Sequence, residues 1–256
     1  MRCVTLNTWK NEGDFHARLA AMAAGLGALN ADVIALQECF VAERLGLDTA
    51  AALGRTLSMQ VTQWPMRAKK RPHDGASVDS RADLAILSRA RPMAVAMTRF
   101  VIDPRDGERG LLSIELDHHG IKLRVGCTHL THLRDETAAT LRADQAMTAA
   151  ARLMAGWSGP AVLMGDMNAD ARHSSMAPLF ANLALDQTCR VAAKACGDID
   201  HVLLFQGTPS CAWIARSVAM PPNRRHPTLG PSDHPAVIAD IAVTMSTHAS
   251  LCDPNR

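Results

Sequence analysis

A run of apolar residues that stops abruptly at a carboxylate is the feature that most constrains the fold of this chain. Residues Ala161 to Met164 are all apolar, which predicts a buried strand, and they are followed by Gly165, Asp166 and, two residues on, Asn168. Asp166 can accept a proton or orient a water molecule, and the Asn168 amide can donate to a phosphate oxygen. Because Gly, Asp and Asn also dominate turns, this stretch taken alone favours a simple turn.

The same arrangement recurs at other predicted strands. Three strands end at polar groups: Cys3–Leu6 at Asn7, Val33–Leu36 at Gln37 and Glu38, and Ile121–Cys127 at Thr128 and His129. Two later strands begin with such groups: His201–Phe205 follows Asp200, and Ala236–Val243 follows Asp233 and His234. If the two sets run antiparallel, all these groups meet at one edge of the sheets. Each residue alone has a structural explanation, but together they indicate one site.

The remaining segments predict helices, further strands and one exposed loop. Helices are expected from the N-cap Asp14 to Asn30, in the helical pattern of Val41–Leu57, over Arg134–Trp157 and in part of Ser174–Leu185. Further strands are expected at Met59–Trp64, Leu84–Leu87, Met93–Ile102, Leu111–Leu116 and Ser210–Val218. The basic segment Arg67–Gly75, broken by proline and glycine, predicts an exposed loop. Its charges indicate a solvated surface, or alternatively a rim that guides a polyanion.

Composition indicates a folded protein without a membrane span. The 256 residues allow one large domain or two small ones, and no linker forces a split. Hydrophobic residues make up 48% and charged residues 20%, which argues against disorder, and a net charge of +2 does not diagnose a nucleic-acid binder. The N-terminus lacks the apolar core of a signal peptide, and the seven cysteines include no Cys-x-x-Cys pair. We therefore expect a cytoplasmic protein with free thiols.

With these residues in place, the chain resembles the endonuclease/exonuclease/phosphatase superfamily of magnesium-dependent phosphoesterases. The resemblance spans nearly the whole chain and rests on these elements: Leu6-Asn7, Leu36-Gln37-Glu38, Ile86-Leu87-Ser88-Arg89, Thr128-His129-Leu130, Gly165-Asp166-x-Asn168, Ile199-Asp200-His201 and Ser232-Asp233-His234. The Gly-Asp-x-Asn and Ser-Asp-His elements are specific when both accompany Gln-Glu, and weak singly. The resemblance implies an α/β fold, a four-layer sandwich of two mixed β-sheets packed face to face with helices outside. It would form one domain over residues 1–246, followed by a tail over 247–256.

The resemblance also implies a metal site. Glu38 would be the principal Mg²⁺ ligand, with Asn7 beside it and Asp233 as a further ligand. Ligation by oxygen alone suits a hard cation that keeps several waters, so Mg²⁺ is expected, with Mn²⁺ as a substitute.

Five further residues would carry the chemistry by the same resemblance. Asp166 would orient and deprotonate the attacking water, and Asn168 would hold a non-bridging phosphate oxygen. His234, oriented by Asp200, would stabilise the charge that develops on phosphorus, and His129 would contact the phosphate from the opposite side.

The expected function is Mg²⁺-dependent hydrolysis of phosphate esters by a monomeric phosphodiesterase or nuclease. Nucleic acid is the leading substrate, and a phosphatase or phosphodiesterase acting on a small-molecule or lipid-derived phosphate is the alternative. A second alternative is a catalytically silent binding module of the same fold. Because family members share a core and differ in loops, we expect Arg67–Gly75 and Ala219–Gly230 to select the substrate.

Overall fold

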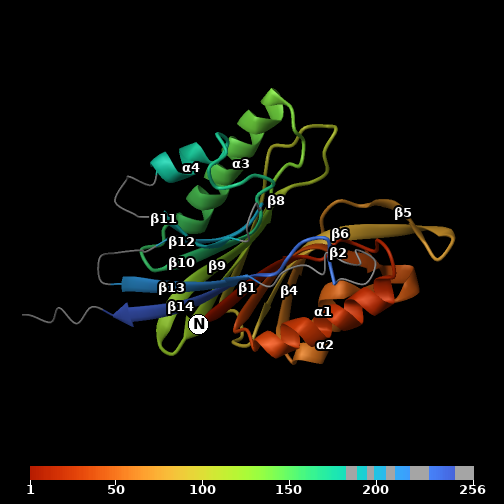
Figure 1. Ribbon diagram of the computed structural model, residues 1–256, viewed down its shortest axis with the longest axis horizontal. Coiled ribbons are helices and arrows are strands. Elements are labelled where there is room, and N and C mark those ends of the chain that lie inside the picture. Colours follow the sequence, from red (N-terminus) through yellow and green to blue (C-terminus); the bar gives the residue numbers. More distant parts are fainter. Residues whose placement is uncertain (183–188, 195–198, 206–210, 220–230, 246–256) are drawn as a thin grey trace, which may run out of the picture.

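Two mixed β-sheets pack face to face, and helices cover the outer face of each (Figure 1). This confirms the four-layer α/β sandwich predicted from the sequence. The computed structural model describes residues 1–182, 189–194, 199–205, 211–219 and 231–245. The predicted tail over 247–256 and residues 220–230 of the predicted substrate loop lie outside these ranges, and the domain boundary stays a prediction.

The first sheet has eight strands in the described residues. The strand order is β13-β14-β1-β2-β6-β4. In addition, β3 pairs with β2, and β5 pairs with β6. Their bounds are β1 Arg2–Asn7, β2 Val33–Ala42, β3 Leu47–Asp48, β4 Gln60–Trp64, β5 Lys69–His73, β6 Ala76–Ser88, β13 Cys211–Ala219 and β14 Val237–Met245. Strands β1 and β2 are parallel, whereas β14 runs antiparallel to β1.

The second sheet repeats this arrangement with six strands in the described part of the chain. The strand order is β11-β12-β10-β9-β8-β7. The bounds are β7 Ala94–Arg99, β8 Gly110–His118, β9 Ile121–His129, β10 Ala161–Asp166, β11 Cys189–Lys194 and β12 Asp200–Phe205. Strands β9 and β10 are parallel, and β12 runs antiparallel to β10. Strand β11 had not been predicted from the sequence.

The helices connect the parallel strands across the outer faces. Helix α1 (Phe15–Leu29) joins β1 to β2, α3 (Glu136–Met154) joins β9 to β10, and α2 (Thr49–Leu57) and α4 (Ala177–Asn182) lie beside them. The predicted ends of α1 are confirmed, because Asp14 Oδ1 accepts a hydrogen bond from the Ala17 amide at 2.9 Å and Asn30 adopts the left-handed conformation. No helix in the described ranges is long and apolar enough to cross a membrane.

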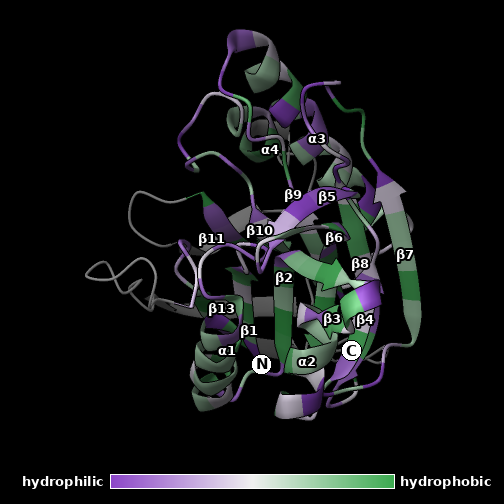
Figure 2. Ribbon diagram, turned by 90° about the vertical axis from the view of Figure 1, so that its right-hand side faces the viewer, coloured by the Kyte–Doolittle hydropathy of each residue, from purple (hydrophilic) through white to green (hydrophobic). Residues whose placement is uncertain are grey.

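Apolar side chains form one core between the sheets and one under each helical layer. On β10, Val162 and Met164 point into the core between the sheets, whereas Ala161 and Leu163 pack under α3 and α4. This alternation makes both faces of the strand apolar, which explains its uninterrupted apolar sequence. Figure 2 shows the contrast between the largely hydrophobic β2 and the hydrophilic β5.

A buried arginine holds two loops at the site end of the first sheet. Arg18 of α1 is 1% exposed, and its guanidinium donates to five backbone carbonyls, those of Thr8, Trp9, Lys10, Glu12 and Pro231. A buried guanidinium is tolerated only when its donors are satisfied. These bonds tie the loop after Asn7 to the segment that precedes Asp233.

The expected helix over Val41–Leu57 is wrong in its first half. Strand β2 continues through Ala42, a short 3₁₀ turn spans Glu43–Leu45, and only residues 49–57 are helical. Gly46 adopts a left-handed φ of 66°, which stops a helix, and Asp48 caps the helix that follows by accepting from the Ala51 amide.

The expected exposed loop over Arg67–Gly75 is also wrong. Residues Lys69–His73 form β5, which pairs with β6, and Asp74 and Gly75 make the turn with positive φ values. Arg71 and His73 are buried, and the Arg71 Nη1 donates to Ser80 Oγ at 2.9 Å. Pro72 is tolerated because β5 is an edge strand.

Three cysteine side chains are described, and all are free and buried: Cys3, Cys39 and Cys127. Burial raises the pKa of Cys3 and of Cys127 to about 12, so both thiols stay protonated. The side chains of the other four cysteines lie outside the described part of the chain.

Candidate active site

Strand direction gathers the predicted polar groups at one edge of the two sheets. In the second sheet, Asp166 at the end of β10 lies opposite His129 of β9 on one side and Asp200 of β12 on the other. In the first sheet, Asn7 at the end of β1 pairs with Gln37 of β2. The prediction that strands ending and strands beginning in polar residues meet at one edge is confirmed for these groups.

Gly165 lets the backbone of β10 approach β9 closely just before the carboxylate. Its φ is 148°, and a Cβ at this position would overlap the carbonyl oxygen of Thr128. A side chain at residue 165 would therefore force the two strands apart and move Asp166.

The Asp166 carboxylate is buried and held by two donors. Its Oδ2 accepts from Asn7 Nδ2 at 3.1 Å across the gap between the sheets, and its Oδ1 accepts from the Asn168 amide at 2.8 Å. His129 Nε2 lies 3.3 Å from Oδ2. Burial, followed by the nearby charge of Asp200, raises the pKa of Asp166 to about 7. Asp166 is thus positioned and poised to take up a proton near neutral pH.

His234 is a cation that lies between two carboxylates. Its Nδ1 lies 2.6 Å from Asp200 Oδ2, and its Nε2 lies 3.9 Å from Asp166 Oδ2. Burial alone would lower the pKa of His234, but the hydrogen bond to Asp200 and the charges of Asp200, Asp166 and Asp233 raise it to about 9. The imidazolium therefore donates Nδ1–H to Asp200 and directs Nε2–H into the site.

His129 has the opposite protonation preference. Burial, and after it the positive charges of Arg109, His234 and Lys10, lower the pKa of His129 well below its ordinary value. A neutral imidazole donates one hydrogen bond without a net charge. The site thus combines a neutral His129 with a cationic His234, a distinction that spacing in the sequence does not reveal.

Asn168 shapes the turn behind Asp166. It adopts a left-handed φ of 52°, and its Nδ2 donates to the Leu130 carbonyl at 3.0 Å while its backbone amide holds Asp166. Arg134 Nη1 donates to the Asn168 carbonyl at 3.1 Å. The role of Asn168 in holding a phosphate oxygen stays a prediction, since one N–H of its amide is already engaged.

Glu38 does not end its strand as expected, and that prediction is wrong. Strand β2 continues to Ala42, and its register against β6 shifts between Leu36 and Cys39. Glu38 lies in this bulge with a φ of 56°. A bulge re-aims a side chain without ending the strand, so Glu38 still reaches the site edge, where its Oε2 lies 2.8 Å from Lys10 Nζ.

The oxygen donors at this edge suit a divalent cation. Burial is the largest effect on the pKa of Asp233, and it raises this pKa. The positive charge of His234 opposes it, and the negative charge of Glu38 raises the pKa further. The carboxylates of Glu38 and Asp233 therefore lie close enough to destabilise each other. A cation between them would relieve this repulsion. Asn7 Oδ1 already accepts from the Trp9 amide at 3.0 Å, so its part as a ligand stays a prediction.

A second group of residues could also hold a cation. Ligand atoms of Asp166, Asp200 and His234 lie within 4.8 Å of one another. We favour Glu38 and Asp233, because the His234 imidazolium already supplies the positive charge between Asp166 and Asp200. Carboxylate oxygens alone also suit Mg²⁺ better than a set that includes an imidazole.

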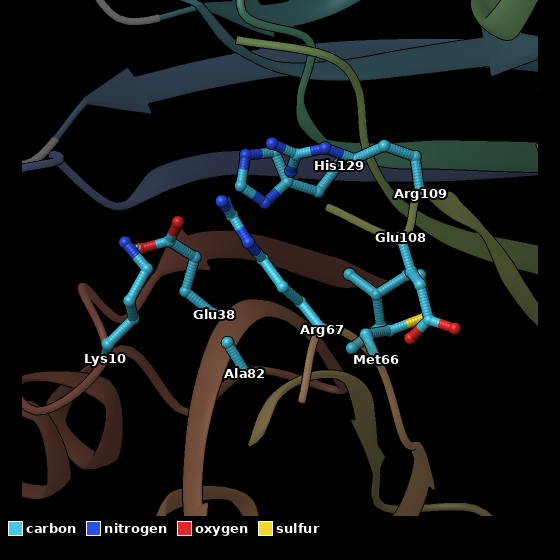
Figure 3. Close-up of a pocket in the computed structure, with 9 residues that line it drawn as sticks. Lys10, Glu38, Met66, Arg67, Ala82, Glu108, Arg109 and His129 are labelled. Atoms are coloured by element: carbon cyan, nitrogen blue, oxygen red, sulfur yellow. Dashed lines mark ion pairs between the residues drawn. The ribbon is translucent and has the colours of Figure 1, made fainter. Parts of the chain in front are cut away.

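A pocket beside His129 contains residues that sequence reasoning did not place in the site. It is lined by Lys10, Glu38, Met66, Arg67, Ala82, Leu84, Glu108, Arg109 and His129, and Figure 3 shows several of these side chains pointing into it. No sequence signal identified Arg109, and Arg67 was expected only in a substrate-selecting loop. The sequence pattern identified polar residues at the ends of apolar strands, whereas Arg67 and Arg109 lie just before strands β5 and β8.

Residues 4–234 match the model of the Endonuclease/Exonuclease/phosphatase family. The chain therefore belongs to this family, whose members are nucleases, phosphodiesterases or phosphatases. A search of the curated proteins finds no match.

Solved structures share the fold at low sequence identity. An endonuclease/exonuclease/phosphatase from Beutenbergia cavernae is 17% identical, with a TM-score of 0.67 over 97% of this chain and 73% of that one. The human Nocturnin catalytic domain with bound sulfate is 15% identical, with a TM-score of 0.69 over 95% of this chain and 94% of that one. A Bacteroides thetaiotaomicron mannosyl-6-phosphatase is 15% identical, with a TM-score of 0.64 over 94% and 99%.

We predict that Gly165→Ala will destabilise the protein by about 2 kcal/mol or more and abolish activity, because the new methyl group displaces Asp166. Gly27→Ala is the matched control, since a Cβ there meets only Leu57 Cδ2 at 3.5 Å and alanine favours the helix. Urea unfolding and turnover measure both effects. Equal stability and activity of the two variants would show that β10 tolerates a side chain here.

Proposed function

We propose that this chain is a Mg²⁺-dependent phosphodiesterase that uses an activated water molecule. The observation that supports this most strongly is the Asp166 carboxylate, held by Asn7 and the Asn168 amide, with His129 and the His234–Asp200 pair beside it. A base, a neutral donor and a cation thus converge within one buried edge. This combination meets the main demand of phosphoryl transfer, which is to orient a nucleophile and to neutralise phosphate charge.

Asp166 acts as the general base. Its carboxylate accepts a proton from the attacking water, because burial and Asp200 raise its pKa to about 7 and so match its basicity to neutral pH. Asn7 Nδ2 and the Asn168 amide fix the carboxylate in one orientation. This fixed orientation reduces the entropy cost of placing the water in line with the bond that breaks.

The two histidines stabilise the phosphoryl oxygens. His234 donates Nε2–H as an imidazolium, and Asp200 holds its ring in place through the 2.6 Å contact with Nδ1. His129 donates as a neutral imidazole from β9. Asn168 is assigned to a non-bridging oxygen through the remaining N–H of its side-chain amide.

The metal is assigned to Glu38 and Asp233, with Asn7 beside them. Bound there, Mg²⁺, or Mn²⁺ in its place, supplies a positive charge that neutralises the phosphate and helps to align an in-line displacement. Lys10, whose Nζ lies 2.8 Å from Glu38 Oε2, holds that carboxylate toward the site.

Phosphodiesters are the preferred substrates in this proposal, with nucleic acid as the leading class. The alternative within enzymes is a phosphatase or phosphodiesterase acting on a small-molecule or lipid-derived phosphate. A silent binding module is disfavoured, because a carboxylate such as that of Asp166 is costly to bury without a function. Turnover of bis-p-nitrophenyl phosphate, p-nitrophenyl phosphate, plasmid DNA, RNA and phospholipids with Mg²⁺ separates these classes. The monomeric state and the cytoplasmic location stay predictions.

We predict that Asp166→Asn and His234→Ala will each reduce kcat by about 10² or more, while KM changes far less. Because both residues act on one transition state, the double variant should lose less free energy than the two losses added together. The exposed Asp144→Asn and His119→Ala serve as controls. Near wild-type turnover by both active-site variants, on the best substrate found, would refute the shared site.

We predict that EDTA will abolish activity, that Mg²⁺ or Mn²⁺ will restore it, and that Glu38→Gln will weaken the metal dependence without unfolding the protein. The carboxylate charge at Glu38 is what holds the cation, and glutamine removes it. Glu43→Gln, at the exposed turn after the same strand, is the control. Calorimetric titration with Mg²⁺ and turnover give the readout. Full activity in EDTA by protein free of metal would remove Glu38 from this role.

A further inference from the structure

The pocket beside His129 contains two guanidinium groups that the proposed reaction does not use. In Figure 3 the Arg67 guanidinium points toward the His129 ring and Glu38, and the Arg109 guanidinium reaches the same ring from the other side. Both arginines therefore border the place where the scissile phosphate would lie. Arg67 comes from the segment before β5, and Arg109 directly precedes β8.

A single buried carboxylate positions both arginines. Asp106 Oδ1 accepts from Arg109 Nη2 at 2.8 Å and lies 4.0 Å from Arg67 Nη1, and Asp106 Oδ2 accepts from Arg109 Nε at 3.1 Å. The Asp106 side chain is fully buried. Although burial would raise its pKa, the bonds from Arg109 lower the pKa of Asp106 well below its ordinary value, so the carboxylate stays charged.

A glycine makes room for the Arg67 side chain. A Cβ at Gly107 would overlap Cγ, Cδ and Nε of Arg67, so the Arg67 stem lies directly against this glycine. The Arg67 backbone is fixed as well, because its carbonyl accepts from Arg71 Nη2 at 3.3 Å. The Arg67 side chain is only 30% exposed, which is low for an arginine on a surface loop.

The charges around the pocket leave a positive surplus. Lys10 is offset by Glu38 at 2.8 Å, and Glu108 is offset by Arg99 at 2.5 Å and points away from the two guanidinium groups in Figure 3. Arg67 and Arg109 share the one charge of Asp106. One guanidinium charge therefore remains for an anion from outside, and the planar fork of arginine matches the geometry of phosphate.

We propose that Arg67 and Arg109 form a second anion subsite, which selects substrates that carry a further phosphate beside the scissile one. The inference deepens the proposed function and rests on it for the position of the scissile phosphate. A neighbouring phosphate of a nucleotide strand and the second phosphate of a sugar bisphosphate share this chemistry. Arg67 is the selective residue, since Arg109 is 5% exposed and mainly engaged with Asp106.

The experiment compares thymidylyl-thymidine with the same dinucleotide phosphorylated at its 5′ or its 3′ end. We expect the wild type to hydrolyse one phosphorylated form with a kcat/KM about tenfold higher or more, the scale of one charge-assisted contact. Arg67→Ala should reduce this preference to within about twofold, and Arg67→Lys should retain part of it. Lys70→Ala, which removes an exposed charge from the same hairpin, is the matched control and should retain the full preference.

Gly107→Ala tests the positioning of Arg67 without removing its charge. The new methyl group displaces the flexible Arg67 stem and not the backbone, so the protein should fold normally while the preference falls toward that of Arg67→Ala. Glucose 1,6-bisphosphate compared with glucose 6-phosphate forms the second arm, and a preference there alone assigns the subsite to sugar phosphates. Equal rates with and without the added phosphate in both arms, or equal losses in Arg67→Ala and Lys70→Ala, would overturn the subsite.

A binding measurement separates failure of the subsite from failure of the proposed function. In the Asp166→Asn background, thymidine 3′,5′-bisphosphate is titrated calorimetrically in the presence of Mg²⁺. We expect Arg67→Ala to weaken its binding about tenfold and to change the binding of thymidine 5′-monophosphate much less. If no phosphodiester is hydrolysed, this result still supports the subsite while the proposed function fails. Equal binding with and without Arg67 contradicts the subsite, whatever the turnover.

Discussion

The direction of six strands is the constraint on which the rest of the structure depends. Strands β1, β2, β9 and β10 run toward one edge, and β12 and β14 start from it. Parallel neighbours require a crossover connection, and α1 and α3 provide it across the outer faces of the two sheets. The four layers and the site thus have one cause, because reversing β10 alone would place Asp166 at the opposite edge from His129 and Asp200.

Burial gives these groups their distinct protonation states. Desolvation raises the pKa of Asp166 and lowers that of His129, whereas the contact with Asp200 keeps His234 charged despite burial. Two carboxylates and two imidazoles can lie together at this buried edge of the sheets, because each charge lies beside an opposite charge or a fixed donor. Arg18 supports this edge from behind, since its five hydrogen bonds hold the loops next to Asn7 and Asp233.

Strand ends and helix caps could be predicted from the sequence because they depend on local pattern. The apolar run before Asp166, the strand that starts at Asp200 and the caps Asp14 and Asn30 lie where the sequence predicted. The bulge at Glu38 was missed because it arises from register against β6, which no local pattern encodes. The β5 hairpin was missed because its charges and its proline obscure the alternation that buries Arg71. Arg109 was missed because its position depends on the tertiary contact with Asp106.

The central claim is that Asp166 and its neighbours activate water, and not a protein group, as the nucleophile. The stereochemistry at phosphorus tests this most directly: one diastereomer of a phosphorothioate diester is hydrolysed in heavy-oxygen water (H₂¹⁸O), and the configuration of the labelled phosphorothioate product is determined. Direct attack by water is one in-line displacement, so the expected result is inversion of configuration at phosphorus. Net retention of configuration would show two successive displacements, of which a side chain makes the first, and it would contradict the direct attack of water.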